Sequence, residues 1–347
     1  MTVLLWRRRA LLAVALVLVA TGCGRPPAVT STTRVRPAVE AVVEVGFTVA
    51  DLARSVAFFR DVLDFEKLAE AEVSGVEASR LHGVTGMRAR VARLRLGAER
   101  LVLTQVLQPR GRSMPAGSRS NDRWFQHVAI IVSDMDRAHR RLREHRVVSI
   151  SPAPQTLPAW NPKAGGIRAF YFQDADGHPL EVLQFPPDKG ERRWHETDRL
   201  FLGIDHTAIV ARDTDASLRF YRDLLGLRVA GVSDNHGPAQ ERLNNVAGAH
   251  LRITTLRAPA GPGIELLEYL SPRDGRPAPL DGRASDLWHW QTTLLSDHAE
   301  AIWADLAAGR ALFVSPGVVA LPPDSVGVRR GFIVRDPDGH AVEVVGR

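Results

Sequence analysis

The chain has 347 residues, of which 45% are hydrophobic and 24% are charged, and its formal net charge is +6. This length exceeds one ordinary hydrophobic core, so we expect two domains, and the balance of residues excludes a largely disordered chain. The basic residues are scattered, with no dense Lys/Arg cluster interleaved with aromatics, so nothing indicates a nucleic-acid partner.

The first 23 residues have the pattern of an export signal. Arg7, Arg8 and Arg9 precede an apolar run over residues 10–20 that is too short to span a membrane comfortably. The run ends at Cys23, and residues 19–23 resemble a bacterial lipobox, apart from an Ala where Leu is commoner. We therefore expect residues 1–22 to be removed as a signal peptide. Because these residues hold three arginines and no acid, the net charge would become about +3.

Cys23 is the only cysteine, which excludes an intramolecular disulfide and a thiolate metal site. Its position fits lipidation, and residues 23–40, rich in Pro, Thr and Ser, are expected to form a tether. The protein would then be an exported lipoprotein on the periplasmic or extracellular face of a membrane. An uncleaved anchor or an ordinary signal peptide is the alternative, and Arg8-Arg9 leaves open whether export is general or twin-arginine.

The two halves of the chain repeat one pattern. Residues 43–51 and Ser55–Leu63 match residues 205–213 and Ser217–Leu225. In each half the first segment predicts a strand and the second a helix, because apolar residues recur on one helical face. Asp51 and Asp213 are placed to cap the helices, and Gly226 is placed to end the second one.

Each half also ends in the same hairpin. Phe332–Arg335 and Ala341–Val345 alternate as two strands around an Asp-Pro-Asp-Gly turn, and Phe170–Leu183 repeats the pattern. Glu181 stands in the place of Glu343. A carboxylate in such an apolar strand is costly to bury unless a cation or hydrogen-bond donors receive it.

Each half divides again into two modules. The second module of each half begins with a strand and a helix, predicted at residues 127–132 and 135–144, and at residues 290–295 and 299–308. The chain is therefore predicted to hold four copies of a strand, a helix and about three strands.

This pattern resembles the vicinal oxygen chelate superfamily, which includes glyoxalase I, methylmalonyl-CoA epimerase, extradiol dioxygenases and bleomycin-resistance proteins. The resemblance spans Val42–Val345. It implies an α+β fold in which four βαβββ modules form two cupped, mixed β-sheet domains. We expect these domains at residues 41–187 and 200–347, each with a hollow lined by the first and last strands of its modules.

The resemblance places four metal ligands in the second domain, at His206, Glu265, Gln291 and Glu343. One imidazole, one amide and two carboxylates without sulfur suit a divalent Zn, Ni, Co, Mn or Fe(II) ion. The matching positions of the first domain are Glu44, Val102, His127 and Glu181. Because Val102 cannot bind a metal, we expect this first site to be degenerate, with only Glu44, His127 and Glu181 left as a weaker set.

The ligand set favours proton abstraction next to a carbonyl, with Glu343 or Glu265 as the base. The protein would then be an isomerase or lyase similar to glyoxalase I, acting on a small molecule with vicinal oxygens. An extradiol dioxygenase is one alternative, but Gln291 replaces its second histidine and Ile333 stands in place of its tyrosine. A metal-free binding or resistance protein is another, and export favours it because glutathione is scarce outside the cytoplasm.

A loop from Pro272 to Asp286 carries three arginines, Arg273, Arg276 and Arg283. They allow two interpretations, an anionic substrate or a solvated surface. The sequence leaves the oligomeric state open.

Overall fold

The computed structural model describes residues 38–196, 198–321 and 327–347. The predicted signal peptide, Cys23 and most of the predicted tether lie outside the described residues. Within these ranges, no helix combines the length and apolarity needed to cross a membrane.

Four modules follow one another along the chain. The first contains β1 (Ala41–Thr48), α1 (Leu52–Leu63), β2 (Glu66–Ser74), α2 (Val76–His82), β3 (Arg88–Leu96) and β4 (Glu99–Gln108). The second contains β5 (Gln126–Val132), α3 (Met135–Glu144), β6 (Val148–Ser149), β7 (Gln155–Thr156), β8 (Arg168–Gln173) and β9 (Pro179–Gln184). A short 3₁₀ helix, η1 (Arg192–Trp194), lies in the link to the second half.

The second half repeats this order. The third module contains β10 (Phe201–Val210), α4 (Thr214–Leu218), the π-helical η2 (Arg219–Leu224), β11 (Arg228–His236), α5 (Pro238–Asn244), β12 (His250–Arg257) and β13 (Gly263–Ser271). The fourth contains β14 (Trp290–Leu295), α6 (Ala299–Ala308), β15 (Leu312–Phe313), β16 (Val319–Ala320), β17 (Arg330–Arg335) and β18 (Ala341–Gly346).

The predicted helix ends are confirmed. The Asp51 carboxylate accepts the N–H of Arg54 at 3.0 Å, and Asp213 caps α4 in the same way. Gly226, with φ at +79°, follows the second helix where the chain must turn. That helix differs from the prediction in one respect, because its second part is π-helical and not α-helical.

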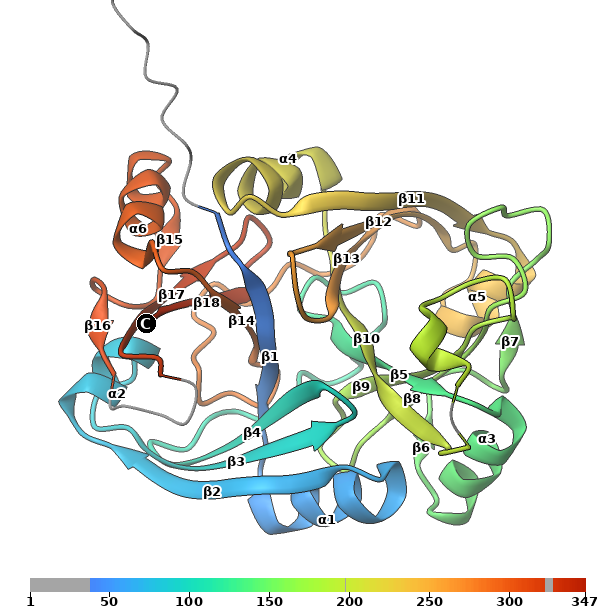
Figure 1. Cartoon of the computed structure of the whole chain (residues 1–347), viewed down its shortest axis with the longest axis horizontal. Helices are drawn as coiled ribbons and strands as arrows, with labels where there is room; N and C mark the ends of the chain where they lie inside the picture. Colours follow the sequence, from blue (N-terminus) through green and yellow to red (C-terminus); the bar gives the residue numbers. More distant parts are fainter. Residues whose placement is uncertain (1–37, 197, 322–326) are drawn as a thin grey trace, which may run out of the picture. The chain divides into compact units, whose positions relative to one another are not determined.

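The strands of the described residues form two mixed sheets of nine strands each, which confirms the predicted α+β fold class. Sheet A has the order β15-β17-β18-β14-β1-β4-β3-β2, with β16 beside β17. Sheet B has the order β11-β12-β13-β10-β5-β9-β8-β6, with β7 beside β8. In Figure 1 the blue strands from the start of the chain accordingly share a sheet with orange and red strands from its end.

This pairing corrects the expectation that consecutive modules share a hollow. β1 pairs antiparallel with β14, and β10 pairs antiparallel with β5. Sheet A therefore combines modules one and four, and sheet B combines modules two and three. Each tandem repeat contributes one module to each sheet.

Unlike the sheets, two apolar cores lie mostly within one tandem repeat each. One core joins α1 and the strands of module one to α3 and the strands of module two, and includes Phe47, Phe59, Ile130 and Phe172. A second core joins modules three and four through α4, η2 and α6. Full burial of one such Phe side chain contributes about 1.5–3 kcal/mol. Phe201, Ile204 and Trp290 of the second repeat also belong to the first core, so the repeats pack against each other as well.

The arginine-rich loop is mainly structural. Arg276 forms a bidentate ion pair with the buried Asp122 carboxylate, and its guanidinium lies 4.6 Å from the Trp124 ring. Arg112 forms the corresponding bidentate ion pair with Asp286, and its guanidinium lies 4.7 Å from the Trp288 ring. The two segments that link the modules of each repeat thus hold each other through charge-assisted bonds.

Candidate metal centre

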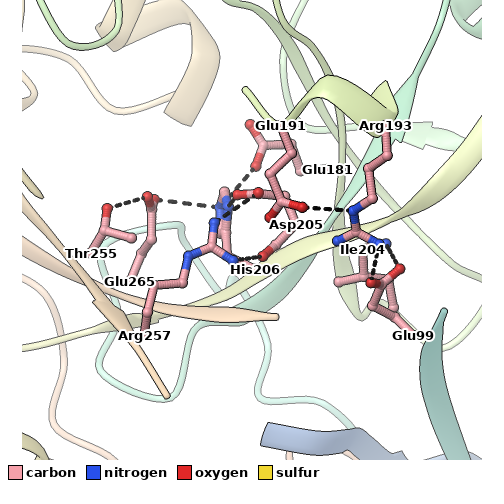
Figure 2. A network of polar contacts seen from close by, with 10 residues as sticks. All are labelled: Glu99, Glu181, Glu191, Arg193, Ile204, Asp205, His206, Thr255, Arg257 and Glu265. Atoms are coloured by element: carbon pink, nitrogen blue, oxygen red, sulfur yellow. Dashed lines mark hydrogen bonds and ion pairs between the residues drawn. The ribbon is translucent and has the colours of Figure 1, made fainter. Parts of the chain in front are cut away.

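Four ligand-type side chains converge on sheet B: His127 from β5, Glu181 from β9, His206 from β10 and Glu265 from β13. Oε2 of Glu181 lies 3.1 Å from Nε2 of His127 and 3.7 Å from Nε2 of His206. Oε2 of Glu265 lies 3.4 Å from the same His206 nitrogen. Figure 2 shows Glu181 and Glu265 approaching His206 from either side. We call these four residues the sheet B quartet.

The strand register explains this convergence. Glu181 and His206 are both paired with Ala129, in one row across the sheet. His127 and Glu265 are both paired with Ala208, in the next row on the same face. The two alanines are fully buried, and their small side chains leave the space that the four longer side chains enter.

The sheet B quartet fits a divalent metal ion. Ligand atoms of His127, Glu181 and His206 all lie within 4.8 Å of one another and are buried. Nitrogen and oxygen ligands about 2.0–2.2 Å from a common ion are separated by roughly 3.0–3.6 Å in octahedral or tetrahedral geometry, close to the spacings observed here. Two imidazoles and two carboxylates suit Zn, Ni, Co, Mn or Fe(II).

The surrounding contacts orient His206. Its Nδ1 lies 2.9 Å from Oδ2 of Asp205, and Arg257 donates to the other oxygen of Asp205 at 2.8 Å. The hydroxyl of Thr255 donates to Oε1 of Glu265 at 2.8 Å. Asp205 thus binds Nδ1 of His206, and Thr255 binds Oε1 of Glu265. The other atoms, Nε2 of His206 and Oε2 of Glu265, are directed at the centre of the quartet (Figure 2).

Electrostatics favour positive charge at this point. Burial opposes ionisation of His206, but the carboxylates of Glu265, Asp205 and Glu181 outweigh it and raise the pKa of the imidazole to about 9. Burial opposes ionisation of Asp205 as well, yet His206 and Arg257 lower its pKa below the ordinary value. The carboxylates thus create a site that attracts a cation.

A cavity of about 340 Å³ opens onto the quartet. Its walls are largely apolar, with Leu157, Val232 and Leu267 among them. Tyr171 also lines it, and burial together with the nearby Glu181 carboxylate raises the pKa of its phenol well above the ordinary value. Tyr171 therefore remains protonated and can donate a hydrogen bond to a ligand.

The ligand set expected from the sequence is divided between the sheets. His206 and Glu265 lie in sheet B as predicted partners, but Gln291 and Glu343 lie in sheet A with Glu44. The expectation that His206, Glu265, Gln291 and Glu343 share one metal is therefore corrected. The weaker set is also divided, because His127 and Glu181 join His206 while Glu44 does not. The cause is the pairing of β10 with β5 in place of β14.

The corresponding positions of sheet A, which we call the sheet A quartet, are Glu44, Val102, Gln291 and Glu343. Arg93 stands where sheet B has Thr255, and its Nε lies 3.5 Å from Oε2 of Glu44. Glu343 accepts hydrogen bonds from the amide of Gln291 at 2.7 Å and from the hydroxyl of Thr293 at 3.0 Å. Burial, followed by the nearby Glu44, raises the pKa of Glu343 to about 7. The cavity there is only about 40 Å³.

Sequence reasoning missed the residues around the ligands, Asp205, Thr255 and Arg257. The adjacent Asp205-His206 pair was a usable signal, although a regular strand would point the two side chains to opposite faces. The two-residue spacing of Thr255 and Arg257 also places them on one face of a strand.

Comparison with known proteins identifies the fold family. The Glyoxalase/Bleomycin resistance protein/Dioxygenase superfamily matches residues 41–182 and 203–344, most of the chain. The chain belongs to this superfamily. Members of the superfamily generally bind a divalent metal, and the buried His127, Glu181 and His206 could hold one here.

Individual members are similar over different lengths. A 2-epi-5-epi-valiolone epimerase of Actinomyces sp is 33% identical over 155 residues, which are 43% of this chain and 82% of the relative. Glyoxalase I from Zea mays has a similar fold, with a TM-score of 0.56, 14% identity, and 88% and 92% of the two chains covered. A putative dioxygenase from Bacillus subtilis gives a TM-score of 0.52 at 13% identity, with 89% and 86% covered.

Proposed function

We propose that the protein is a metal-dependent isomerase, epimerase or lyase that moves a proton next to a carbonyl of a small molecule with adjacent oxygens. The observation that carries this proposal is the convergence of His127, Glu181, His206 and Glu265 beneath a cavity. A divalent ion bound by these four residues would polarise the substrate oxygens and lower the pKa of the neighbouring C–H. The sequence similarity to an epimerase also supports it.

Glu265 is better placed than Glu181 to be the base. The Glu181 side chain lies between the two imidazoles and is 5% exposed. The Glu265 side chain lies near one imidazole, that of His206, and is 19% exposed. Thr255 fixes one oxygen of Glu265 and leaves the other directed at the centre. Glu265 would take a proton from the substrate carbon and return it to a neighbouring atom of the substrate, with no other reactant required.

The test has two parts, metal content and proton exchange. Full-length protein should carry about one divalent ion per chain by elemental analysis, and His206→Ala should lose it. In D₂O, a panel of 2-oxoaldehyde adducts, 2-oxo acids and cyclic polyhydroxy ketones should reveal a compound that incorporates deuterium next to its carbonyl. Glu265→Gln should abolish incorporation, and Glu343→Gln should retain it. Metal-free wild-type protein that still binds a small molecule would support a binding or resistance role instead.

Ring cleavage of a catechol by dioxygen is a second candidate. Two histidines and one glutamate, His127, His206 and Glu181, match the ligand types of extradiol enzymes, and Tyr171 lies directly opposite Glu181 on β8. Glu265 weakens this candidate, since a fourth ligand would occupy a position that dioxygen or the catechol needs. Oxygen uptake by the Fe(II)-loaded protein with catechol would select this function over proton transfer.

We also propose that the protein is exported and attached to a membrane through a lipid on Cys23. The support is the sequence of residues 1–23. When the full chain is expressed in a bacterial host, radiolabelled palmitate should be incorporated into the wild type and should be absent from Cys23→Ser. Label retained by that variant would contradict the proposal.

A further inference from the structure

Glu99, at the start of β4 in sheet A, contacts the strand that carries His206. The side chain is buried, and its Oε2 accepts the N–H of Ile204 at 3.2 Å. Its Oε1 accepts a hydrogen bond from Nη1 of Arg193 at 2.6 Å. Arg193 comes from η1, and its guanidinium lies 3.8 Å from the Trp194 ring. Figure 2 shows this pair on the side of Asp205 and His206 remote from Thr255.

Ile204 directly precedes a β-bulge. Ile204 is paired with Ile130 and His206 with Ala129, so Asp205 is an additional residue in β10. In a regular strand, Asp205 and His206 would point to opposite faces of the sheet. The bulge changes their directions, and Oδ2 of Asp205 reaches Nδ1 of His206.

Sheet A has a bulge at the equivalent position, but there the backbone N–H is bound by a neutral carbonyl and not by a carboxylate. The register of β1 shifts between Val42 and Glu44, at the corresponding position. There the N–H of Val42 donates to the backbone carbonyl of Ala260 at 3.0 Å. A neutral backbone acceptor therefore satisfies the N–H next to the bulge in sheet A. The Glu99 carboxylate, although it comes from sheet A, binds the bulge of sheet B that carries Asp205 and His206, and the bulge of sheet A has Val43 in place of Asp205.

Gly203 provides the room for this contact. A Cβ atom at this position would overlap the carboxylate of Glu99 and lie 2.9 Å from the ring of Trp194. The sequence thus places a residue without a side chain at the point where the buried Glu99 carboxylate of sheet A approaches β10.

We propose that Glu99, held by Arg193, is a positioning residue for His206. It fixes the bulge in β10 so that Asp205 holds Nδ1 of His206 and Nε2 faces Glu181 and Glu265. The importance of this role for catalysis rests on the proposed metal centre, but the ordering of His206 is measurable in metal-free protein.

The first experiment uses metal-free full-length protein. In Glu99→Ala, the amides of Ile204 and Asp205 should exchange with solvent at least about tenfold faster than in the wild type. In the wild type, the contact with Asp205 should make the Nδ1 proton of His206 visible in the ¹⁵N spectrum, and this signal should be lost in Glu99→Ala. Val62→Ala, a core change in α1, is the control for general loss of stability. If Glu99→Ala gives the same exchange pattern as this control, Glu99 does not position His206.

The second experiment measures zinc affinity by competition with a chelator. Glu99→Ala should bind zinc about 10–100-fold more weakly, the range expected for loss of a partner outside the ligand set. Glu99→Gln keeps an acceptor for Ile204 and should lose less, and Gly203→Ala should resemble Glu99→Ala. Wild-type affinity in Glu99→Ala would overturn the inference. A wild-type protein without zinc affinity would instead overturn the metal centre, while hydrogen exchange would still decide the role of Glu99.

Discussion

The two quartets occupy equivalent positions of two sheets with the same topology, but their side chains differ in chemistry. Sheet B has two imidazoles and two carboxylates beneath a cavity of about 340 Å³. Sheet A has one carboxamide, two carboxylates and an apolar Val102, with a cavity of about 40 Å³. The guanidinium of Arg93 lies near Glu44, so that a fixed side chain supplies positive charge in sheet A.

This comparison shows that equivalent positions of one fold can carry a set of metal-ligand side chains in one sheet and a different set in the other. Val102 stands where sheet B has Glu265 and cannot bind a metal. Arg93 stands where sheet B has Thr255, and its positive charge would repel a metal ion. The hydrogen bonds of Glu343 to Gln291 and Thr293 keep the remaining carboxylate satisfied. The strands of sheet A thus retain their role in packing without the ligand set.

The largest expected effect separates the two quartets directly. Glu181→Ala should weaken zinc binding by more than about 1,000-fold, because removal of an outer partner alone costs about 10–100-fold. Glu343→Ala should leave the affinity unchanged. Titration with zinc and elemental analysis would measure both. Equal losses in the two variants would show that sheet A contributes to the metal centre.

The next effect concerns pH and sheet A alone. Because the pKa of Glu343 in the folded protein is about 7, above its ordinary 4.5, its protonated form stabilises the fold at low pH. This contribution is present below about pH 4.5 and is lost as the pH rises through 7. Glu343→Gln should therefore be more stable than the wild type by about 3 kcal/mol at pH 8 and nearly equal at pH 4. Urea unfolding at both values tests this, and a constant difference would contradict it.

A smaller effect is expected from the partner of His206. Asp205→Asn replaces a carboxylate that holds Nδ1 and should weaken zinc binding about 10-fold, at the lower end of the range for such partners. Asp215→Asn, which changes an exposed carboxylate paired with Arg252, is the matched control and should have no effect. Unchanged affinity in Asp205→Asn would remove Asp205 from the metal centre.

The smallest effect distinguishes two adjacent threonines. Thr255→Val removes the hydroxyl that donates to Glu265 and should lower the free energy of unfolding by about 1 kcal/mol, with a few-fold loss of zinc affinity. Thr254→Val is the control, since its buried hydroxyl has no partner among the described residues. That variant should be neutral or slightly stabilised. The reverse order of stabilities would contradict the assignment of Thr255.

The sequence by itself determined the local structure. The helices Met135–Glu144 and Ala299–Ala308 and the strand Trp290–Leu295 agree with the predicted ranges, because apolar periodicity and turn residues are local signals. The sequence also located seven of the eight quartet positions as acids, amides or imidazoles, and Val102 as the exception. The sequence therefore identified the residue type at each quartet position, but not which positions lie together.

Only the tertiary structure decided which positions meet. The backbone hydrogen bonds that join β10 to β5 do not depend on side-chain identity, and the repeated modules offer nearly equivalent edges for pairing. The choice depends on contacts between distant segments, such as Arg276 with Asp122 and Glu99 with Ile204. This is why His206 meets His127 and Glu181, while Glu343 and Gln291 lie on the other sheet.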